Sequence, residues 1–176
     1  MKNIFFKTKS RKLKLYLPVK KRSMQQHITI TSISEMSFII ARECGGNAER
    51  KASERVMTFL QERHPLLICN AQRFYVSTYD DVCECGTECG DGFKLPGGSD
   101  LEIMHVPAGR YAVLPDDRLG DIRVACAKMD LWLKNNSVNA YEDEPVFAVY
   151  ETQSGKYDTE NIRMKIYKRL KFDKKG

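Results

Sequence analysis

Apolar and polar residues alternate along several short segments of the chain, and this pattern predicts β-strands. In the segment 162–170, Ile162, Met164 and Ile166 alternate with charged or polar residues. The segment 27–33 is rich in isoleucine and threonine, whose β-branched side chains favour an extended chain. Denser apolar or aromatic runs predict the remaining strands, at 36–42, 74–79, 101–106, 110–114 and 144–151.

Two longer segments carry apolar residues at every third or fourth position, which predicts amphipathic helices. The first helix is expected over 47–63, with Asn47 as its N-cap and His64-Pro65 at its end. The second helix is expected over 119–134. The predicted buried stripes are Ala48, Ala52, Val56, Phe59 and Leu60 in the first helix, and Ile122, Ala125, Met129, Trp132 and Leu133 in the second.

The order of these elements predicts an α+β fold made of two similar halves. Each half has the order strand, helix, strand, strand, and the segment 27–33 adds an extra opening strand to the first half. The halves share no obvious sequence identity, so the repeat is one of element order only. Such halves place sheet beside sheet with helices on one face, and the seam between the halves is a natural position for a ligand cleft.

Composition and charge distinguish a basic N-terminal segment from the rest of the chain. With 42% hydrophobic and 30% charged residues among 176, the chain is expected to be globular. The net charge is +6, but residues 1–26 alone contain nine basic residues and no acidic one. We therefore expect a flexible basic leader (1–26), one domain (27–172) and a short tail (173–176). The leader is predicted to bind nucleic acid only weakly, through phosphate contacts, or else only to aid solubility.

The redox state of the six cysteines depends on the cellular compartment of the protein. No apolar stretch approaches the roughly 20 residues that span a membrane, and no secretory signal is visible, so we expect a cytoplasmic protein with no membrane partner. Its thiols should then be reduced. Cys83, Cys85 and Cys89 cluster in a glycine-rich segment that is expected to be an exposed loop. Structural zinc, with His105 or a distant cysteine as the fourth ligand, is the alternative, but the spacing lacks paired CxxC units and no metal site is predicted.

The motif Pro107-Ala-Gly-Arg-Tyr-Ala-Val113 resembles the signature P-x-G-x-Y-A-V of the GyrI-like small-molecule-binding family. Four further features follow the family's order. They are Tyr79-Asp80-Asp81, Gly120, Trp132-Leu133, and the two segments Pro145–Tyr150 and Ile166-Tyr167 of the closing strands. The resemblance covers about residues 27–172. It implies the SHS2-type fold of the effector-binding domains of bacterial AraC-type and MerR-type transcription regulators, here apparently standing alone.

The resemblance implies that the domain binds a small organic ligand, in ligand sensing or sequestration. Aromatic side chains stack on planar ligands and attract cations to their faces, although the same residues could simply form core. No cofactor is predicted. The candidate ligand-binding residues are Tyr75, Tyr79, Glu102, Tyr111, Trp132, Phe147, Tyr150 and Tyr167.

One position departs from the family pattern. Family members often carry glutamate at the position of Ala148, and in the regulators that buried carboxylate pairs with cationic drugs. An alanine cannot offset the desolvation of a buried cation. The sequence therefore predicts a cleft that favours neutral planar ligands, unless Glu102 supplies a carboxylate from another strand.

The sequence is also compatible with two other functions. Some GyrI-like proteins are hydrolases of reactive natural products, and the gyrase inhibitor of the family implies a module that binds a protein partner. For hydrolysis, Glu102 and Tyr150 are the candidate residues, and a Cys126–His105 nucleophilic pair is an alternative. A structural histidine is the simpler interpretation of His105. We expect binding rather than catalysis and predict no catalytic residue.

Overall fold

The structure is a computed structural model that describes residues 27–70, 72–116, 122–152 and 162–171. The predicted leader and tail, Gly120 and the start of the second predicted helix lie outside these residues. The strands are β1 (Thr29–Ile33), β2 (Met36–Cys44), β3 (Arg73–Tyr79), β4 (Val82–Glu88), β5 (Glu102–Val106), β6 (Gly109–Asp116), β7 (Phe147–Thr152) and β8 (Ile162–Arg169). The helices are α1 (Ala48–Arg63), α2 (Pro65–Asn70) and α3 (Ile122–Asn135).

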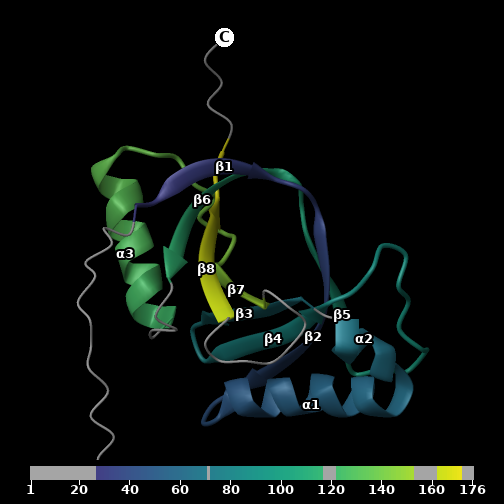
Figure 1. Cartoon of the computed structure of the whole chain (residues 1–176). Coiled ribbons are helices and arrows are strands. Elements are labelled where there is room, and N and C mark those ends of the chain that lie inside the picture. The colour runs from purple at the N-terminus through teal and green to yellow at the C-terminus, as the bar shows by residue number, and fades with distance from the viewer. Residues whose placement is uncertain (1–26, 71, 117–121, 153–161, 172–176) are drawn as a thin grey trace, which may run out of the picture.

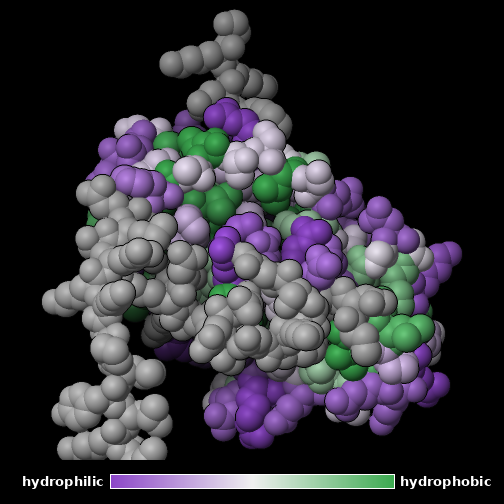
Figure 2. All heavy atoms as spheres, in the orientation of Figure 1, coloured by the Kyte–Doolittle hydropathy of each residue, from purple (hydrophilic) through white to green (hydrophobic). Residues whose placement is uncertain are grey.

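The described strands join one antiparallel sheet in the order β1-β6-β8-β7-β3-β4-β2-β5. The sheet curls into a half-barrel, as Figure 1 shows. Helix α1 packs on β2 and β4, and α3 packs on β6 and β8, so both helices cover the convex face. The outward surface of α1 is hydrophilic in the space-filling view of Figure 2. Side chains that point to the concave face are therefore not covered by α1 or α3.

The sheet confirms the predicted α+β fold of two strand–helix–strand–strand halves. β2, α1, β3 and β4 form one half, and β6, α3, β7 and β8 form the other. The halves meet where β3 pairs with β7, with Tyr75 opposite Val149. The two remaining strands are exchanged between the halves, because β1 pairs with β6 and β5 pairs with β2.

The prediction of an exposed loop at Cys83, Cys85 and Cys89 is wrong. These residues belong to or directly follow β4, an inner strand between β2 and β3, and all three side chains are buried. β4, rather than 101–106, is the last strand of the first half. Gly86 allows its close packing, because a Cβ there would overlap the Ile39 carbonyl oxygen and lie 2.6 Å from Cγ2 of Ile40.

The helices follow the predicted apolar stripes. Ala52, Val56 and Leu60 of α1 are buried against the sheet, and Asn47 occupies the N-cap position in a left-handed conformation without a side-chain cap bond. α1 ends at Arg63, as predicted, but Pro65 then opens the short helix α2 instead of a loop, because proline is well suited to the first helical position. In the part of the chain that the structure describes, no helix is long and apolar enough to span a membrane.

Candidate functional site

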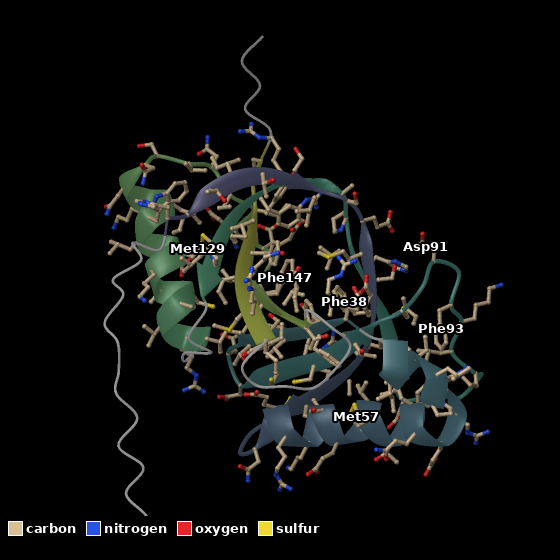
Figure 3. The ribbon with its side chains drawn as sticks, viewed as in Figure 1. Phe38, Met57, Asp91, Phe93, Met129 and Phe147 are labelled. Atoms are coloured by element: carbon tan, nitrogen blue, oxygen red, sulfur yellow. The ribbon has the colours of Figure 1, made fainter. Side chains whose placement is uncertain are left out.

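Strand alternation gathers aromatic rings on the concave face. Tyr75 of β3, Phe147 of β7 and Tyr167 of β8 lie on adjacent strands and point to the same side of the sheet. The rings of Phe147 and Tyr167 stack nearly parallel at a centroid distance of 5.2 Å, and those of Tyr75 and Phe147 lie 5.4 Å apart. Phe38 extends this row, as the labelled side chains in Figure 3 show. The concave aromatic cluster consists of Phe38, Tyr75, Tyr111, Phe147 and Tyr167.

Tyr111 connects this cluster to the family-like motif. Its ring meets Phe147 and Tyr167 edge-on, with centroids 6.2 and 6.3 Å apart, and its hydroxyl donates a hydrogen bond of 2.9 Å to the carbonyl oxygen of Pro107. The motif residue thus belongs to the concave wall. Burial raises the pKa of Tyr111 and of Tyr167 to about 12, so both rings are neutral at physiological pH.

A buried carboxylate lies at the β4 end of the cluster. Glu84 is 1% exposed, and the Tyr79 and Tyr75 hydroxyls donate hydrogen bonds of 2.9 and 3.3 Å to its two oxygens. Nε and Nη2 of Arg42 approach Oε1 of Glu84 at 2.9 and 2.7 Å. Four donors therefore hold one carboxylate, which is how a buried charge is retained in a protein. Desolvation, followed by the hydrogen bond to Glu84, raises the pKa of Tyr79, and burial raises that of Tyr75.

Arg42 connects the buried carboxylate to the rim of the concave face. Its side chain is 42% exposed, and Nη1 lies 3.3 Å from Oε1 of Glu102, whose side chain is 58% exposed. The hydrogen bond to Glu84 is the main reason why the pKa of Arg42 is raised. Glu102 is thus a rim residue paired with Arg42, while Glu84 is the carboxylate beside the aromatic rings.

Five of the predicted site residues, Tyr75, Tyr79, Tyr111, Phe147 and Tyr167, come together on the concave face, with Glu102 at its rim. The other two do not join them. Trp132 packs from α3 against the core under that helix, and Tyr150 points from β7 to the convex side, where it contacts the cores under both helices.

The interpretation of Ala148 also changes. Ala148 is fully buried in the core under α3, because it alternates with Phe147 and Val149 of the concave face. A carboxylate at this position would point toward α3, so the alanine says nothing about the charge of the concave site. Ala148 therefore gives no reason for the concave site to prefer neutral ligands.

Glu84, Arg42 and Phe38 were missed from the sequence. The signal for Glu84 was alternation in β4, where Cys83 and Cys85 face α1 and the glutamate between them faces the other side. A charged residue between two cysteines and next to a glycine is more typical of a loop, which concealed this pattern.

The structure does not bring the alternative catalytic residues together. His105 of β5 has its Nδ1 3.0 Å from Oγ of Ser37 and 3.6 Å from a Glu35 carboxylate oxygen, on an exposed edge of the sheet. Cys126 packs in the core under α3. Glu102 and Tyr150 lie on opposite faces of the sheet. Within the described residues, no group of histidine, cysteine or acidic side chains is arranged to hold a metal ion.

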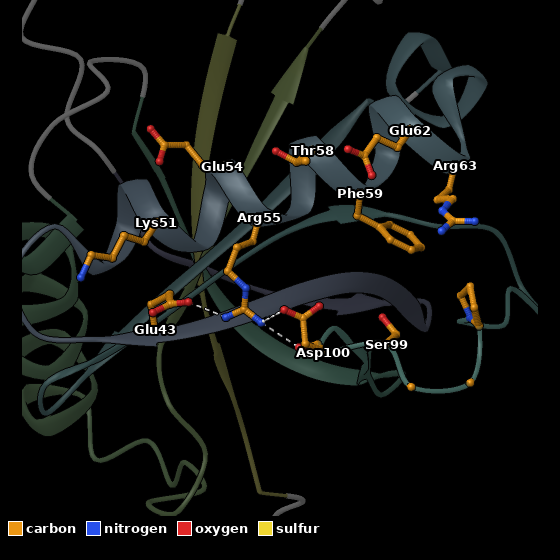
Figure 4. A pocket seen from close by; sticks show the side chains of 13 residues that line it. Glu43, Lys51, Glu54, Arg55, Thr58, Phe59, Glu62, Arg63, Ser99 and Asp100 are labelled. Atoms are coloured by element: carbon orange, nitrogen blue, oxygen red, sulfur yellow. Dashed lines mark hydrogen bonds and ion pairs between the residues drawn. The ribbon is translucent and has the colours of Figure 1, made fainter.

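A polar hollow of about 650 Å³ lies outside the half-barrel, between α1 and the segment 96–100 (Figure 4). Arg55 lies at its centre and is bonded to Glu43 and to Asp100, whose Oδ2 and carbonyl oxygen accept at 2.6 and 2.9 Å. The hydrogen bond to Glu43 is the main cause of the raised pKa of Arg55. Because these charges are already paired within the chain, the hollow is better explained as the anchor of the 96–100 segment than as a ligand site.

Comparison with known proteins finds solved structures that have a similar fold. No protein-family model matches the sequence, and the search of curated proteins gave no match. Among solved structures, the EcmrR C-terminal domain superposes with a TM-score of 0.62 at 16% identity, over 84% of this chain and 99% of that one. A hydrolase from Listeria innocua gives 0.55 at 8% identity, over 83% and 92%. SAV2435 bound to tetraphenylphosphonium gives 0.50 at 9%, over 82% and 94%.

These similarities concern the fold, since the identities are far below those that would indicate a shared activity. Each comparison covers more than nine-tenths of the solved domain, so the whole arrangement of two halves is matched rather than one motif. The chain therefore has the half-barrel fold of SAV2435 and of the EcmrR C-terminal domain.

Proposed function

We propose that the protein is a cytoplasmic GyrI-like domain that binds a small aromatic cation on the concave face and serves in ligand sensing or sequestration. The observation that carries the proposal is the buried Glu84 carboxylate at the end of a row of aromatic rings. Flat rings bury a large area of a planar ligand and favour a cation over their faces. A carboxylate shielded from water adds strong attraction for positive charge.

Each part of the site has a distinct role in this proposal. The stacked rings of Phe147 and Tyr167 are 7% and 5% exposed in the empty protein, and in this proposal they become the wall against which the ligand packs. The hydroxyls of Tyr75 and Tyr79 fix the orientation of Glu84, so its charge needs no rearrangement when a ligand arrives. Arg42 neutralises the negative charge of Glu84 when no ligand is bound.

The fold similarity supports this ligand class. Tetraphenylphosphonium, the compound bound to SAV2435, is an aromatic monocation. EcmrR has also been solved in a complex with DNA, which supports a role for this fold in regulation. In such a role, region 27–172 would supply the ligand-binding part, and nucleic acid would be contacted elsewhere, with at most a weak contribution from residues 1–26.

Calorimetric titration with a matched pair of compounds tests the proposal. Tetraphenylphosphonium carries the charge, and triphenylphosphine oxide is a neutral relative with similar rings. The wild-type protein should prefer the cation, and Glu84→Gln should weaken cation binding by about tenfold or more while neutral binding changes little. Glu102→Gln is the control, because it removes a carboxylate at the exposed rim. Equal cation affinity in the wild type and in Glu84→Gln, or no binding of either compound, would contradict the proposal.

Hydrolysis is the second candidate, favoured by the similarity to the hydrolase from Listeria innocua. The concave face offers a carboxylate and two tyrosine hydroxyls that each hydrogen-bond to it, the residue types of acid–base chemistry. Recovery of the ligand after prolonged incubation separates the two functions. An unchanged ligand indicates binding only, whereas a hydrated or cleaved product whose formation requires Glu84 indicates an enzyme.

A further inference from the structure

A separate pocket opens on the convex side of the sheet, next to the seam of the two halves. It has a volume of about 410 Å³ and lies between α1 and strands β3, β4, β7 and β8. Its lining is mainly apolar and includes Met57, which lies on α1 (Figure 3). The other apolar lining side chains are Val56, Phe74, Val76, Tyr150 and Ile162. Most of its lining side chains lie on the convex side of the sheet, and Tyr75 is the member of the concave aromatic cluster that also lines it.

Two hydroxyl groups in the wall of this pocket lack a partner. They are Oγ1 of Thr87 on β4 and Oγ1 of Thr152 on β7, and they are the only buried side-chain polar atoms without a hydrogen bond among the described residues. Thr87 is 1% exposed and Thr152 is 8% exposed. An unpaired buried hydroxyl destabilises the folded protein, so two in one pocket call for an explanation. Rotation about χ1 can direct either hydroxyl toward a molecule in the pocket.

The sheet register gives the spacing of the backbone positions of these two threonines. Thr87 is level with Phe74 and Tyr150, and Thr152 is two residues farther along β7. With about 4.8 Å between strands and about 3.4 Å per residue, the two threonine Cα atoms are about 12 Å apart. An elongated two-ring molecule with a polar group at each end is long enough to reach both threonines.

The chemistry of the wall favours an uncharged ligand. The hydrogen bond with the neighbouring Cys83 thiol, followed by burial, raises the pKa of Cys85, which lines the pocket, so this thiol is neutral. The nearest carboxylate in the lining belongs to Glu49, whose side chain is exposed to water at the N-terminal end of α1. A threonine hydroxyl can donate or accept, which suits a phenol or a carbonyl group.

We propose that this convex-side pocket is a second small-molecule site, selective for neutral, two-ring compounds with polar ends, which bind through Thr87 and Thr152. The site does not depend on the concave face, since strand alternation points Glu84 and Thr87 to opposite sides of β4. The protein then carries two ligand sites of different charge preference on the two faces of one sheet.

Titration with 4,4′-dihydroxybiphenyl and with unsubstituted biphenyl tests this site. The dihydroxy compound should bind more tightly, and Thr87→Val and Thr152→Val should each weaken it by roughly threefold to tenfold without affecting biphenyl. Both variants should melt at or above the wild-type temperature, because each removes an unpaired hydroxyl while keeping the shape of the side chain. Thr78→Val is the matched control, since its hydroxyl is bonded to Sγ of Cys83 and does not line the pocket.

A blocking variant locates the binding independently. Ser53 is exposed on α1 and lines the pocket, so Ser53→Phe should fill it without disturbing the core and should abolish binding of both compounds. Glu84→Gln should leave that binding unchanged, which separates this site from the concave one. Wild-type affinity in both threonine variants, or binding that survives Ser53→Phe, overturns the proposal whether or not the concave face binds cations.

Discussion

Glu84 and Cys85 are neighbours in β4, yet their side chains lie on opposite faces of the sheet. Glu84 accepts hydrogen bonds from Tyr79 and Arg42 on the concave face, and Sγ of Cys85 lies 3.5 Å from the Glu49 carbonyl oxygen under α1. This single strand thus supplies a carboxylate to one face and a thiol to the other.

The burial of the β4 thiols gives a first prediction. Cys83, Cys85 and Cys89 are buried, whereas Cys44 is exposed. In a protein with Cys44, Cys69 and Cys126 replaced by serine, the three remaining thiols should react with a disulfide reagent only at the rate at which the protein opens. The same protein with Cys44 restored gives the labelling rate of an exposed thiol, which serves as the reference. Rapid labelling of all three thiols in the native protein would contradict the assignment of β4 as an inner strand.

Gly86→Ala should destabilise the protein. The added methyl group would overlap the Ile39 carbonyl and crowd Ile40, so we expect a loss of about 1–3 kcal/mol in the free energy of unfolding. Gly97→Ala is the matched control, because nothing lies within 4 Å of a Cβ at that position. Urea denaturation of both variants measures the difference. Equal stability of the two variants would show that β4 and β2 are not packed as described.

Arg42→Gln should strengthen the binding of tetraphenylphosphonium. Arg42 lies beside Glu84 and repels an incoming cation, so its removal should raise cation affinity several-fold, by about 0.5–1 kcal/mol. The same change should lower the stability of the empty protein, because Glu84 loses its counter-charge. Arg73→Gln removes a cation that pairs with Glu88 instead and serves as the control. Calorimetry in which Arg42→Gln binds the cation no better than wild type would argue against Glu84 as the contact.

Stability should fall in alkaline solution because of the buried tyrosines. The pKa values of Tyr111 and Tyr167 are raised from 10 to about 12, so the unfolded chain releases these protons first as pH rises. Their contribution is complete below pH 10 and is lost between about pH 10 and 12. Burial lowers the pKa of Lys168 and acts in the opposite direction, so the informative comparison is with a variant. Tyr167→Phe should show a shallower decline of unfolding free energy with pH than wild type.

Deletion of residues 1–26 tests the interpretation of the basic leader. All described strands and helices lie beyond this segment, so the shortened protein should keep its melting temperature within a few degrees. Any salt-dependent binding to nucleic acid should be largely lost with the nine basic residues. Undiminished binding by the shortened protein would assign that affinity to the domain itself.

The sequence predicted elements well where a single pattern dominated. β8 alternates apolar and polar residues from Ile162 to Tyr167, and α1 carries Ala52, Val56 and Leu60 on one face, so both were found nearly to the residue. β4 was missed because its residues have weak strand propensity and because its buried charge is stabilised by partners on β2 and β3. Such partners become neighbours only in the folded sheet, and no local pattern reveals them.

The candidate site was also predicted only in part from the sequence. Tyr75, Tyr111 and Phe147 could be named as aromatic candidates, but the face to which each ring points depends on strand register. Tyr150 illustrates this, because it follows Phe147 by three positions and therefore faces the convex side. The two unpaired threonine hydroxyls had no sequence signal at all, since they are distinguished only by what surrounds them.

The exchange of the outer strands affects the order in which this chain can fold during synthesis. β1 is the first described strand to leave the ribosome, but Thr29 pairs with Val113, which emerges only after the whole first half. β5 can join β2 as soon as it appears, whereas β1 has no partner until β6 is made. An early strand that waits for a distant partner slows folding and exposes an unpaired edge to other nascent chains. β1 therefore stays unpaired through a little less than half of the synthesis of the chain, from residue 33 until β6 begins at Gly109.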